Sequence, residues 1–488
     1  MVTVEDAPAA TGASQTRLGS RTLRNTAMVL GARVASRLIA FVTVIATMNQ
    51  LHEAGFGNFQ ALVNYTALVA VLVDLGFNTL YVREGARHPA EVGRYLSNLL
   101  SARVVLALVA LVVLAGALKL AGLESLLLPG FVLMVLTSYS NLLRNTFYAL
   151  QQLTFEAVAI VLESVILLAL VFYGIYQHQG VAYFVWAYAA SYGFSCLYFV
   201  TVILARRMAA ISWRLELAFL RRWFWEGLPF ALTFVLTTLY FKIDVPILLA
   251  IKGADQTGIY SSAYKPFEAL IFVPMTLLQV VFPILSIYHR SSPDRLRQTV
   301  DRFFKALVIL GWPVTVGTVL LAPGLTHLLR LFPAADEPLR ILAVGFVVLF
   351  ANNAFIGALN SIDKQVLFTY AAGISVVVNV ALNVVLIPFF GYDGAAWATV
   401  LTEVALAVTG WVMTARHLGR IPVFRLSWRP LLAGLGMGAA IFPFRDVRGP
   451  ELVVVVLAAG LLYALVVVAI RAVDRSELEL VRQAIRSR

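Results

Sequence analysis

The sequence predicts an all-α membrane protein that crosses the bilayer many times, and three observations support this. Hydrophobic residues make up 60% of the 488 residues and charged residues only 13%, and the mean hydropathy is +0.84. A bilayer core requires about 20 consecutive apolar residues per helix, and such runs recur between Arg24 and Val473. The loops between them are alternately rich and poor in arginine, which is typical of a polytopic topology.

We expect fourteen transmembrane helices, because omitting or adding one would destroy the alternation of loop charge further along the chain. The thirteenth is expected to be short and interrupted by Gly434, Gly436, Gly438 and Pro443. In chain order the expected helices cover residues 24–49, 57–82, 98–120, 126–150, 155–177, 180–205, 227–250, 257–288, 303–325, 337–359, 365–388, 391–414, 430–444 and 451–473.

Loop charge predicts the orientation of these helices. With fourteen helices, the two ends of the chain and the loops after even-numbered helices lie on one side and carry 27 lysines and arginines. The loops on the other side carry 6. Since cationic loops stay in the cytoplasm, both termini are predicted to be cytoplasmic.

Composition also excludes several functions. The formal charge of +12 lies mostly in loops too short to form a basic nucleic-acid-binding domain. The single cysteine, Cys196, falls in an apolar run, which excludes disulfides and thiolate metal sites. The six histidines are scattered, so no metal site is expected. Residues 1–20 lack the apolar core of a signal peptide, so the first helix is expected to be retained as a membrane anchor.

Helices one to six and seven to twelve are interpreted as two copies of one unit. A short turn with glycine and an aromatic residue opens both the second and the eighth helix, at 54–60 and 257–262. Parallel repeats of this kind place a substrate cavity at their interface and work by rocking. The expected organisation is a disordered cytoplasmic tail (1–23), a six-helix bundle (24–206), a basic cytoplasmic linker (207–226), a second six-helix bundle (227–414), two extra transmembrane helices (415–473) and a cytoplasmic tail (474–488).

Several segments resemble a known family. They are Arg24-Asn25-Thr26, the turn at 51–59, the segments at 73–78 and 82–87, and the stretches 243–248 and 258–265. Together they resemble the polysaccharide-biosynthesis, or Wzx-like oligosaccharide flippase, branch of the multidrug/oligosaccharidyl-lipid/polysaccharide exporter superfamily. The resemblance implies two six-helix bundles around a central cavity. It also implies a prokaryotic cytoplasmic membrane protein that moves a polyprenyl-(pyro)phosphate-linked oligosaccharide to the outer leaflet by alternating access. Partners would be the polymerase and glycosyltransferases of the pathway.

Five cations fall inside the expected helices: Arg33, Arg37, Arg103, Lys242 and Lys265. An ionisable group at mid-membrane costs at least ~2.5 kcal/mol, so these side chains should face a water-filled cavity or paired acids. Arg33 and Arg37 are four residues apart and therefore share a helix face. A guanidinium group binds phosphate oxygens in bidentate geometry, so we expect the two to bind the phosphate of the substrate. The alternative is a buried pair neutralised by Asp74 or Glu163.

Helices seven and eight carry a second charged cluster, formed by Lys242, Asp244, Lys265 and Glu268. Pro246 removes a backbone donor and predicts a kink close to Asp244. The two lysines are candidates for phosphate binding, and the two acids for coupling-ion binding or gating. The alternative is a structural salt bridge from Lys242 to Glu268 or from Lys265 to Asp244.

Three further acids, Asp74, Glu163 and Glu403, have no partner evident in the sequence, and Asp74 and Glu163 are candidates for coupling or gating. Polar residues also recur at helical spacing. Asn141, Arg144, Asn145 and Tyr148 form a stripe on helix four, in which Arg144 is a further candidate for phosphate binding. Asn141, Asn145, Asn379 and Asn383 are candidates for sugar contacts, although hydrogen bonding between helices is the commoner use of such amides.

No catalytic residues are evident, and no phosphate-binding GxxxxGK[ST] loop is present, so neither an enzyme nor an ATP-driven pump is expected. No cofactor is expected beyond a coupling ion, H⁺ or Na⁺, or the membrane potential. Two alternatives are a lipid II flippase and a cation-coupled multidrug exporter of the same superfamily. The paired arginines favour an anionic substrate over a cationic drug. A polymerase or ligase would usually require a larger outer loop than 323–337.

Overall fold

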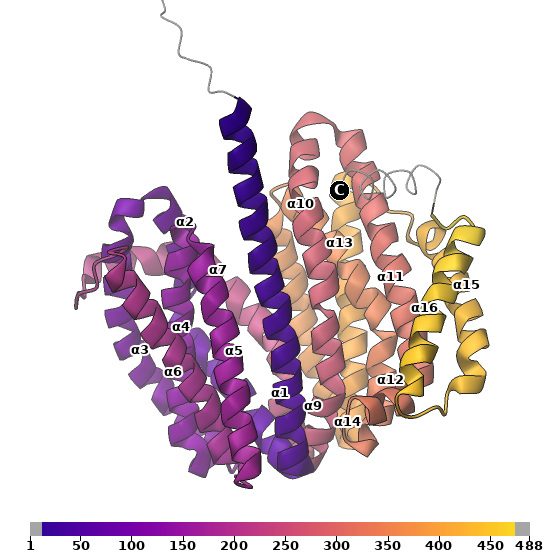
Figure 1. Ribbon diagram of the computed structural model, residues 1–488, viewed down its shortest axis with the longest axis horizontal. Helices are drawn as coiled ribbons and strands as arrows, with labels where there is room; N and C mark the ends of the chain where they lie inside the picture. Colours follow the sequence, from indigo (N-terminus) through magenta and orange to yellow (C-terminus); the bar gives the residue numbers. More distant parts are fainter. Residues whose placement is uncertain (1–11, 474–488) are drawn as a thin grey trace, which may run out of the picture. The chain divides into compact units, whose positions relative to one another are not determined.

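The computed structural model describes residues 12–473, and within this range the chain is helical and has no β-strand. This confirms the all-α prediction (Figure 1). The helices are α1 (Gly12–Asp74), α2 (Phe77–Arg87), α3 (Val92–Leu120), α4 (Leu127–Ala149), α5 (Leu153–Tyr176), α6 (Val181–Ala205), α7 (Leu217–Lys242), α8 (Asp244–Lys252), α9 (Ala254–Leu270), α10 (Phe272–Ser291), α11 (Pro293–Leu328), α12 (Asp336–Val344), α13 (Phe346–Ser361), α14 (Gln365–Leu418), α15 (Val423–Ile441) and α16 (Glu451–Ala469). Four 3₁₀ turns join some of them: Pro89–Glu91, Glu124–Leu126, Pro333–Ala335 and Phe442–Phe444.

Two of these elements are each a pair of helices joined at one non-helical residue. In α1 this residue is His52, with φ 56° and ψ −174°, and in α14 it is Gly391, with φ 57° and ψ −132°. Both lie in or beside predicted turns. The start of α1 corrects the sequence analysis, because residues 12–23, expected in a disordered tail, are helical. Residues 1–11 and the predicted tail 474–488 lie outside the described part of the chain.

Eleven helical segments of the described chain are long and apolar enough to cross a membrane. Those in α1 and α14 contain 44 and 54 residues, more than twice the ~20 that one crossing requires, so each provides a crossing on either side of its kink. The helix α15 is not among the eleven. The chain is therefore a multi-pass membrane protein, and the count of fourteen stays a prediction.

The glycines predicted to interrupt the thirteenth helix lie within the continuous helix α15. Both α15 and α16 pack against α11 (Figure 1). A Cβ atom on Gly438 would lie 2.7 Å from Cγ1 of Val316 in α11. Small residues allow helix backbones to approach closely in membranes, and here they shape a packing surface.

Contacts divide the described chain into two units. The N-terminal unit contains the residues up to Ala46, Leu72–Val113 and Leu128–Ala231. The C-terminal unit contains Thr47–Val71, Leu114–Leu127 and the described residues from Leu232 onward. The boundary near residue 231 lies inside α7, so the basic linker 207–226 belongs to the N-terminal unit. There the backbone N–H of Glu216 donates to Asn98 Oδ1 over 2.8 Å.

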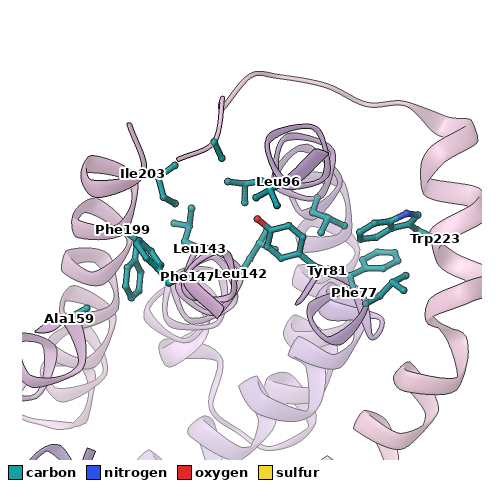
Figure 2. Packing of buried hydrophobic residues seen from close by; sticks show 14 residues of the cluster. Phe77, Tyr81, Leu96, Leu142, Leu143, Phe147, Ala159, Phe199, Ile203 and Trp223 are labelled. Carbon is teal, nitrogen blue, oxygen red and sulfur yellow. The ribbon is translucent and has the colours of Figure 1, made fainter. Parts of the chain in front are cut away.

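An aromatic and aliphatic core holds the N-terminal unit together, and Figure 2 shows its members from α2, α3, α4, α5, α6 and α7 converging. Tyr81 is fully buried, and its hydroxyl shares a 2.9 Å hydrogen bond with Thr146. A buried tyrosine ordinarily finds such a partner. The core fixes α4 and α5, which carry the polar groups described next. Its labelled members in the figure are Phe77, Tyr81, Leu96, Leu142, Leu143, Phe147, Ala159, Phe199, Ile203 and Trp223.

Candidate functional site

Arg33 lies at a junction of α1, α4 and α5 in the N-terminal unit. A hydroxyl–hydroxyl hydrogen bond between Ser36 and Ser164 joins α1 to α5 one turn away. Arg33 Nη2 donates to the Tyr148 hydroxyl over 2.7 Å, and that hydroxyl donates to Glu156 Oε1 over 2.8 Å. The direct distance from Arg33 Nη2 to Glu156 Oε1 is 3.7 Å. The Arg33 side chain keeps 35% of its surface exposed.

Arg37 lies one helical turn further along α1 and is exposed. It forms no hydrogen bond or ion pair with the described residues of its unit. The alternative prediction, that Asp74 or Glu163 neutralises Arg33 and Arg37, is wrong, because both acids pair with other arginines. An exposed guanidinium without a protein partner is available to an anion.

A second polar layer of the N-terminal unit, next to the one formed by Arg33, Tyr148 and Glu156, consists of Arg144, Glu163 and Ser195. Arg144 Nη2 lies 3.0 Å from Glu163 Oε2, which also accepts a hydrogen bond from Ser195. Glu163 thus has the partner that the sequence did not reveal. The polar stripe of α4 is formed as predicted, since Asn141, Arg144, Asn145 and Tyr148 are all half-buried while the neighbours in the helix are buried.

Asp74 also has a partner, contrary to expectation. The guanidinium of Arg103 is 1% exposed and lies 3.4 Å from Asp74 Oδ1. Asp74 further accepts hydrogen bonds from the backbone N–H and the side chain of Asn78, over 3.0 and 2.9 Å. It thereby satisfies a free N–H in the first turn of α2, just after the break at Leu75 and Gly76, where φ is 47° and 75°.

In the C-terminal unit, two lysines share one carboxylate. Glu268 lies 3.4 Å from Lys242 Nζ and 3.1 Å from Lys265 Nζ. The alternative salt bridge from Lys242 to Glu268 is confirmed, and the one from Lys265 to Asp244 is wrong. Lys265 instead donates its other hydrogen bond to Gln60 Oε1 over 3.4 Å. The predicted break near Pro246 is present, since α7 ends at Lys242 and α8 begins at Asp244.

Asp244 lies beside this cluster, and both line one small cavity with Gln60, Asn64 and Tyr264. Its carboxylate is buried and accepts hydrogen bonds from Tyr260, Thr399 and Asn383, over 3.1, 3.0 and 2.9 Å. It forms no ion pair with any described residue. No group of three His, Cys, Asp or Glu side chains in the described chain is arranged to hold a metal.

The amides near Asp244 are buried as well. Asn379 and Asn383 are 1% and 0% exposed, and Asn383 donates to Asn379 Oδ1 over 3.2 Å. The Oδ1 atom of Asn383 has no hydrogen-bond partner in the described chain. This burial favours the alternative that the pair bonds between helices rather than contacting sugar.

Glu403 of α14 is the second buried carboxylate of the C-terminal unit. It accepts hydrogen bonds from the Tyr240 hydroxyl over 2.6 Å and from the Asn352 amide over 2.7 Å. Both partners are neutral, which the sequence could not reveal.

The sequence analysis also missed Glu156, which lies in the first turn of α5. Its position seven residues before Glu163, on the same helix face, was a usable signal.

With this geometry in place, the chain can be compared with known proteins. A family model described as "Polysaccharide biosynthesis protein" matches residues 22–289, more than half of the chain. The chain belongs to the polysaccharide biosynthesis protein family. A second family model, MatE, matches residues 229–385. The predicted resemblance is thereby confirmed.

Three relatives whose names state a function align over part of the chain. The probable flippase AglR of Haloferax volcanii is 26% identical over 245 residues, covering 47% of this chain and 50% of that protein. The probable low-salt glycan biosynthesis flippase Agl15 of the same organism is 24% identical, covering 43% and 45%. The lipid II flippase MurJ of Bacillus subtilis is 27% identical, covering 40% of both. The chain thus spans half or less of these relatives.

Solved structures share the fold over a longer range. A lipid II flippase MurJ in an inward closed conformation superimposes with a TM-score of 0.75 at 14% identity, covering 91% of this chain and 98% of that one. An inward-facing multidrug resistance MATE family transporter of the MOP superfamily gives 0.63 at 15% identity, covering 78% and 94%. These relatives carry the names of flippases and transporters rather than of enzymes, in line with the prediction that the chain is not an enzyme.

Proposed function

We propose that this chain is a flippase for a polyprenyl-(pyro)phosphate-linked oligosaccharide in surface polysaccharide biosynthesis. It moves the substrate from the cytoplasmic to the outer leaflet by alternating access. Family membership and the names of AglR and Agl15 support this assignment. The protein lies in a prokaryotic cytoplasmic membrane with both termini in the cytoplasm, and it acts with the glycosyltransferases and polymerase of the pathway.

The observation that carries the proposal is the pair of arginines on α1. Arg37 is exposed and has no partner among the described residues of its unit, and Arg33, one turn away, is held by a single hydrogen bond to Tyr148. Their planar, permanently charged groups suit the phosphate oxygens of a lipid carrier. The same charges disfavour a cationic drug, the expected cargo of a multidrug exporter. Lys242 and Lys265 add a surplus positive charge in the C-terminal unit, since Glu268 can neutralise only one of them.

Replacement of the two arginines tests this role. Arg33→Ala and Arg37→Ala should each abolish flipping of a lipid-linked oligosaccharide in proteoliposomes while expression stays close to wild type. Lysine at either position should restore flipping only partly, because an ammonium group cannot make the bidentate contact. Arg221→Ala, an exposed arginine at the start of α7, is the matched control. Normal flipping by the alanine variants would refute the proposal.

We further assign the coupling ion, H⁺ or Na⁺, to Asp244. Asp74 and Glu163 are paired with arginines and Glu268 with lysines, whereas Asp244 has only neutral partners. Hydroxyl and amide oxygens around Asp244 suit a small hard cation, and the adjoining cavity offers a path. The membrane potential assists, since moving one negative charge outward gains about 2.3 kcal/mol per 100 mV.

Proteoliposomes separate these two driving forces. An inside-negative potential should accelerate outward flipping by the wild type, and an inward H⁺ or Na⁺ gradient should accelerate it further. Asp244→Asn should lose the dependence on the ion gradient and keep the dependence on potential. The exposed Asp363→Asn should keep both. A wild-type rate indifferent to potential and to both gradients would refute the coupling.

A lipid II flippase is the second candidate, and the similarity to MurJ over 40% of the chain favours it. Lipid II would likewise be an anionic lipid-linked substrate, so the arginines on α1 do not discriminate between the two candidates. Transport assays with both lipid-linked substrates in the same proteoliposomes do so. Flipping of lipid II alone would replace the proposed substrate and leave the phosphate site standing.

A further inference from the structure

Glu156 is a buried carboxylate with few partners. The residue is 1% exposed, its Oε1 atom accepts one hydrogen bond, from Tyr148, and its Oε2 atom accepts none from the described chain. Buried carboxylates are ordinarily paired directly with a cation or satisfied at both oxygens. The neighbouring layer meets this rule, because Glu163 contacts Arg144 at 3.0 Å and also accepts from Ser195. Of these two carboxylates, Glu156 is therefore the one without a direct hydrogen bond to a cation.

The nearest cation is Arg33, but the Tyr148 hydroxyl stands between them. Tyr148 accepts the one hydrogen bond that Arg33 makes with the described chain, and its hydroxyl donates a hydrogen bond to Glu156. A guanidinium has five N–H donors, so most of those on Arg33 stay available. Its remaining distance to Glu156, 3.7 Å, is short enough for attraction and too long for a hydrogen bond.

We infer that Glu156, acting through Tyr148, competes with the phosphate of the substrate for Arg33. The inference rests on the proposed phosphate-binding role of Arg33. When the site is empty, the guanidinium is held toward Glu156. When a phosphate binds the remaining donors of Arg33 and draws the guanidinium away, the carboxylate keeps only the hydroxyl of Tyr148, and this unfavourable burial lowers the affinity for the substrate. A transporter needs such a limit, because binding must be weak enough to allow release. Glu156 thus acts as a positioning residue: it holds Arg33 away from the phosphate and so promotes release of the substrate.

Binding of a short-chain prenyl diphosphate tests this competition. Isothermal titration calorimetry would use the full chain in detergent with farnesyl diphosphate as the probe. Glu156→Gln should bind about tenfold more tightly, because it removes the negative charge that attracts Arg33. Tyr148→Phe should also bind more tightly, although it changes no charge, because it removes the link between Arg33 and Glu156. Simple repulsion between Glu156 and the diphosphate predicts no effect of Tyr148→Phe. Glu226→Gln, in the third turn of α7, is the control and should bind as the wild type.

The dependence on Arg33 separates the inference from the proposed function. Arg33→Ala should weaken binding, and adding Glu156→Gln to it should change nothing further. If Arg33→Ala binds like the wild type, the phosphate role of Arg33 fails and the inference fails with it. If Arg33→Ala weakens binding while Glu156→Gln and Tyr148→Phe bind like the wild type, only the inference is overturned.

Turnover gives an independent reading. In proteoliposomes, Glu156→Gln and Tyr148→Phe should lower both the half-saturating substrate concentration and the maximal rate, because tight binding slows release. A purely structural role would lower the maximal rate without tightening binding. If Glu156→Gln does not fold, Tyr148→Phe decides the question, and an unchanged half-saturating concentration in that variant refutes the inference.

Discussion

In the N-terminal unit, the carboxylates of Asp74 and Glu163 lie within 3.4 Å of an arginine, whereas Asp244 and Glu403 in the C-terminal unit accept hydrogen bonds only from hydroxyl and amide groups of the described chain. Asp74 and Glu163 are fixed counter-ions, whereas Arg37 has none among the described residues of its unit. Asp244 and Glu403 have no cationic partner in the described chain, as the proposed exchange of a mobile ion at Asp244 requires. This contrast agrees with the proposals that Arg33 and Arg37 bind an anion and that Asp244 binds the coupling ion.

The comparison predicts the largest loss of stability at Asp74. Asp74→Ala leaves the fully buried Arg103 without its carboxylate and removes the acceptor that caps α2. Breaking a buried ion pair by removing one partner costs about 3–5 kcal/mol. Denaturant unfolding in detergent should show a loss of this size, and adding Arg103→Met should recover part of it. A loss below about 1 kcal/mol would show that Asp74 is not a fixed counter-ion.

Asp244→Asn should behave differently in the same assay. The amide keeps the shape of the side chain, and no buried cation is left unpaired, since the partners Tyr260, Thr399 and Asn383 are neutral. We expect stability to change by less than about 1.5 kcal/mol in either direction, the scale of one neutral hydrogen bond. A loss as large as that of Asp74→Ala would point to a structural role and would remove the contrast between the units.

The sequence predicted well whatever depends on composition along a single segment. Apolar runs located the helices, and their interruption by Arg33 and Arg37 identified the candidate phosphate site. Which side chains pair depends on which helices lie side by side, and the sequence does not give this. It therefore suggested Asp74 or Glu163 as partners of Arg33, whereas the residue that Arg33 contacts is Tyr148. The same limit hid Glu156, which reads as an ordinary acid in the first turn of a helix. Its role emerges only where α5 meets α4 and α1.

The smallest effect is expected at the surface of the N-terminal unit, where Glu216 of the linker pairs with Arg94 of α3. Arg94 Nη2 donates to Glu216 Oε2 over 2.6 Å, and hydrogen bonds from Arg94 hold the pKa of Glu216 below its ordinary value. Since the folded-state pKa is lowered, the pair stabilises the protein above the unfolded pKa of glutamate, about 4.3. The contribution disappears as the pH falls through the lower, folded-state pKa.

Melting temperatures of the wild type and Glu216→Gln, measured in detergent across the acid range, test this pair. The wild type should melt slightly higher at pH 7, and the two curves should meet as the acid is protonated. The difference at pH 7 should also shrink in high salt, because exposed pairs are screened whereas the buried pair of Arg103 and Asp74 is not. A difference that persists at low pH and high salt would mean that Glu216 acts through the hydrogen bond from its backbone N–H to Asn98 and the packing of the linker, rather than through its charge.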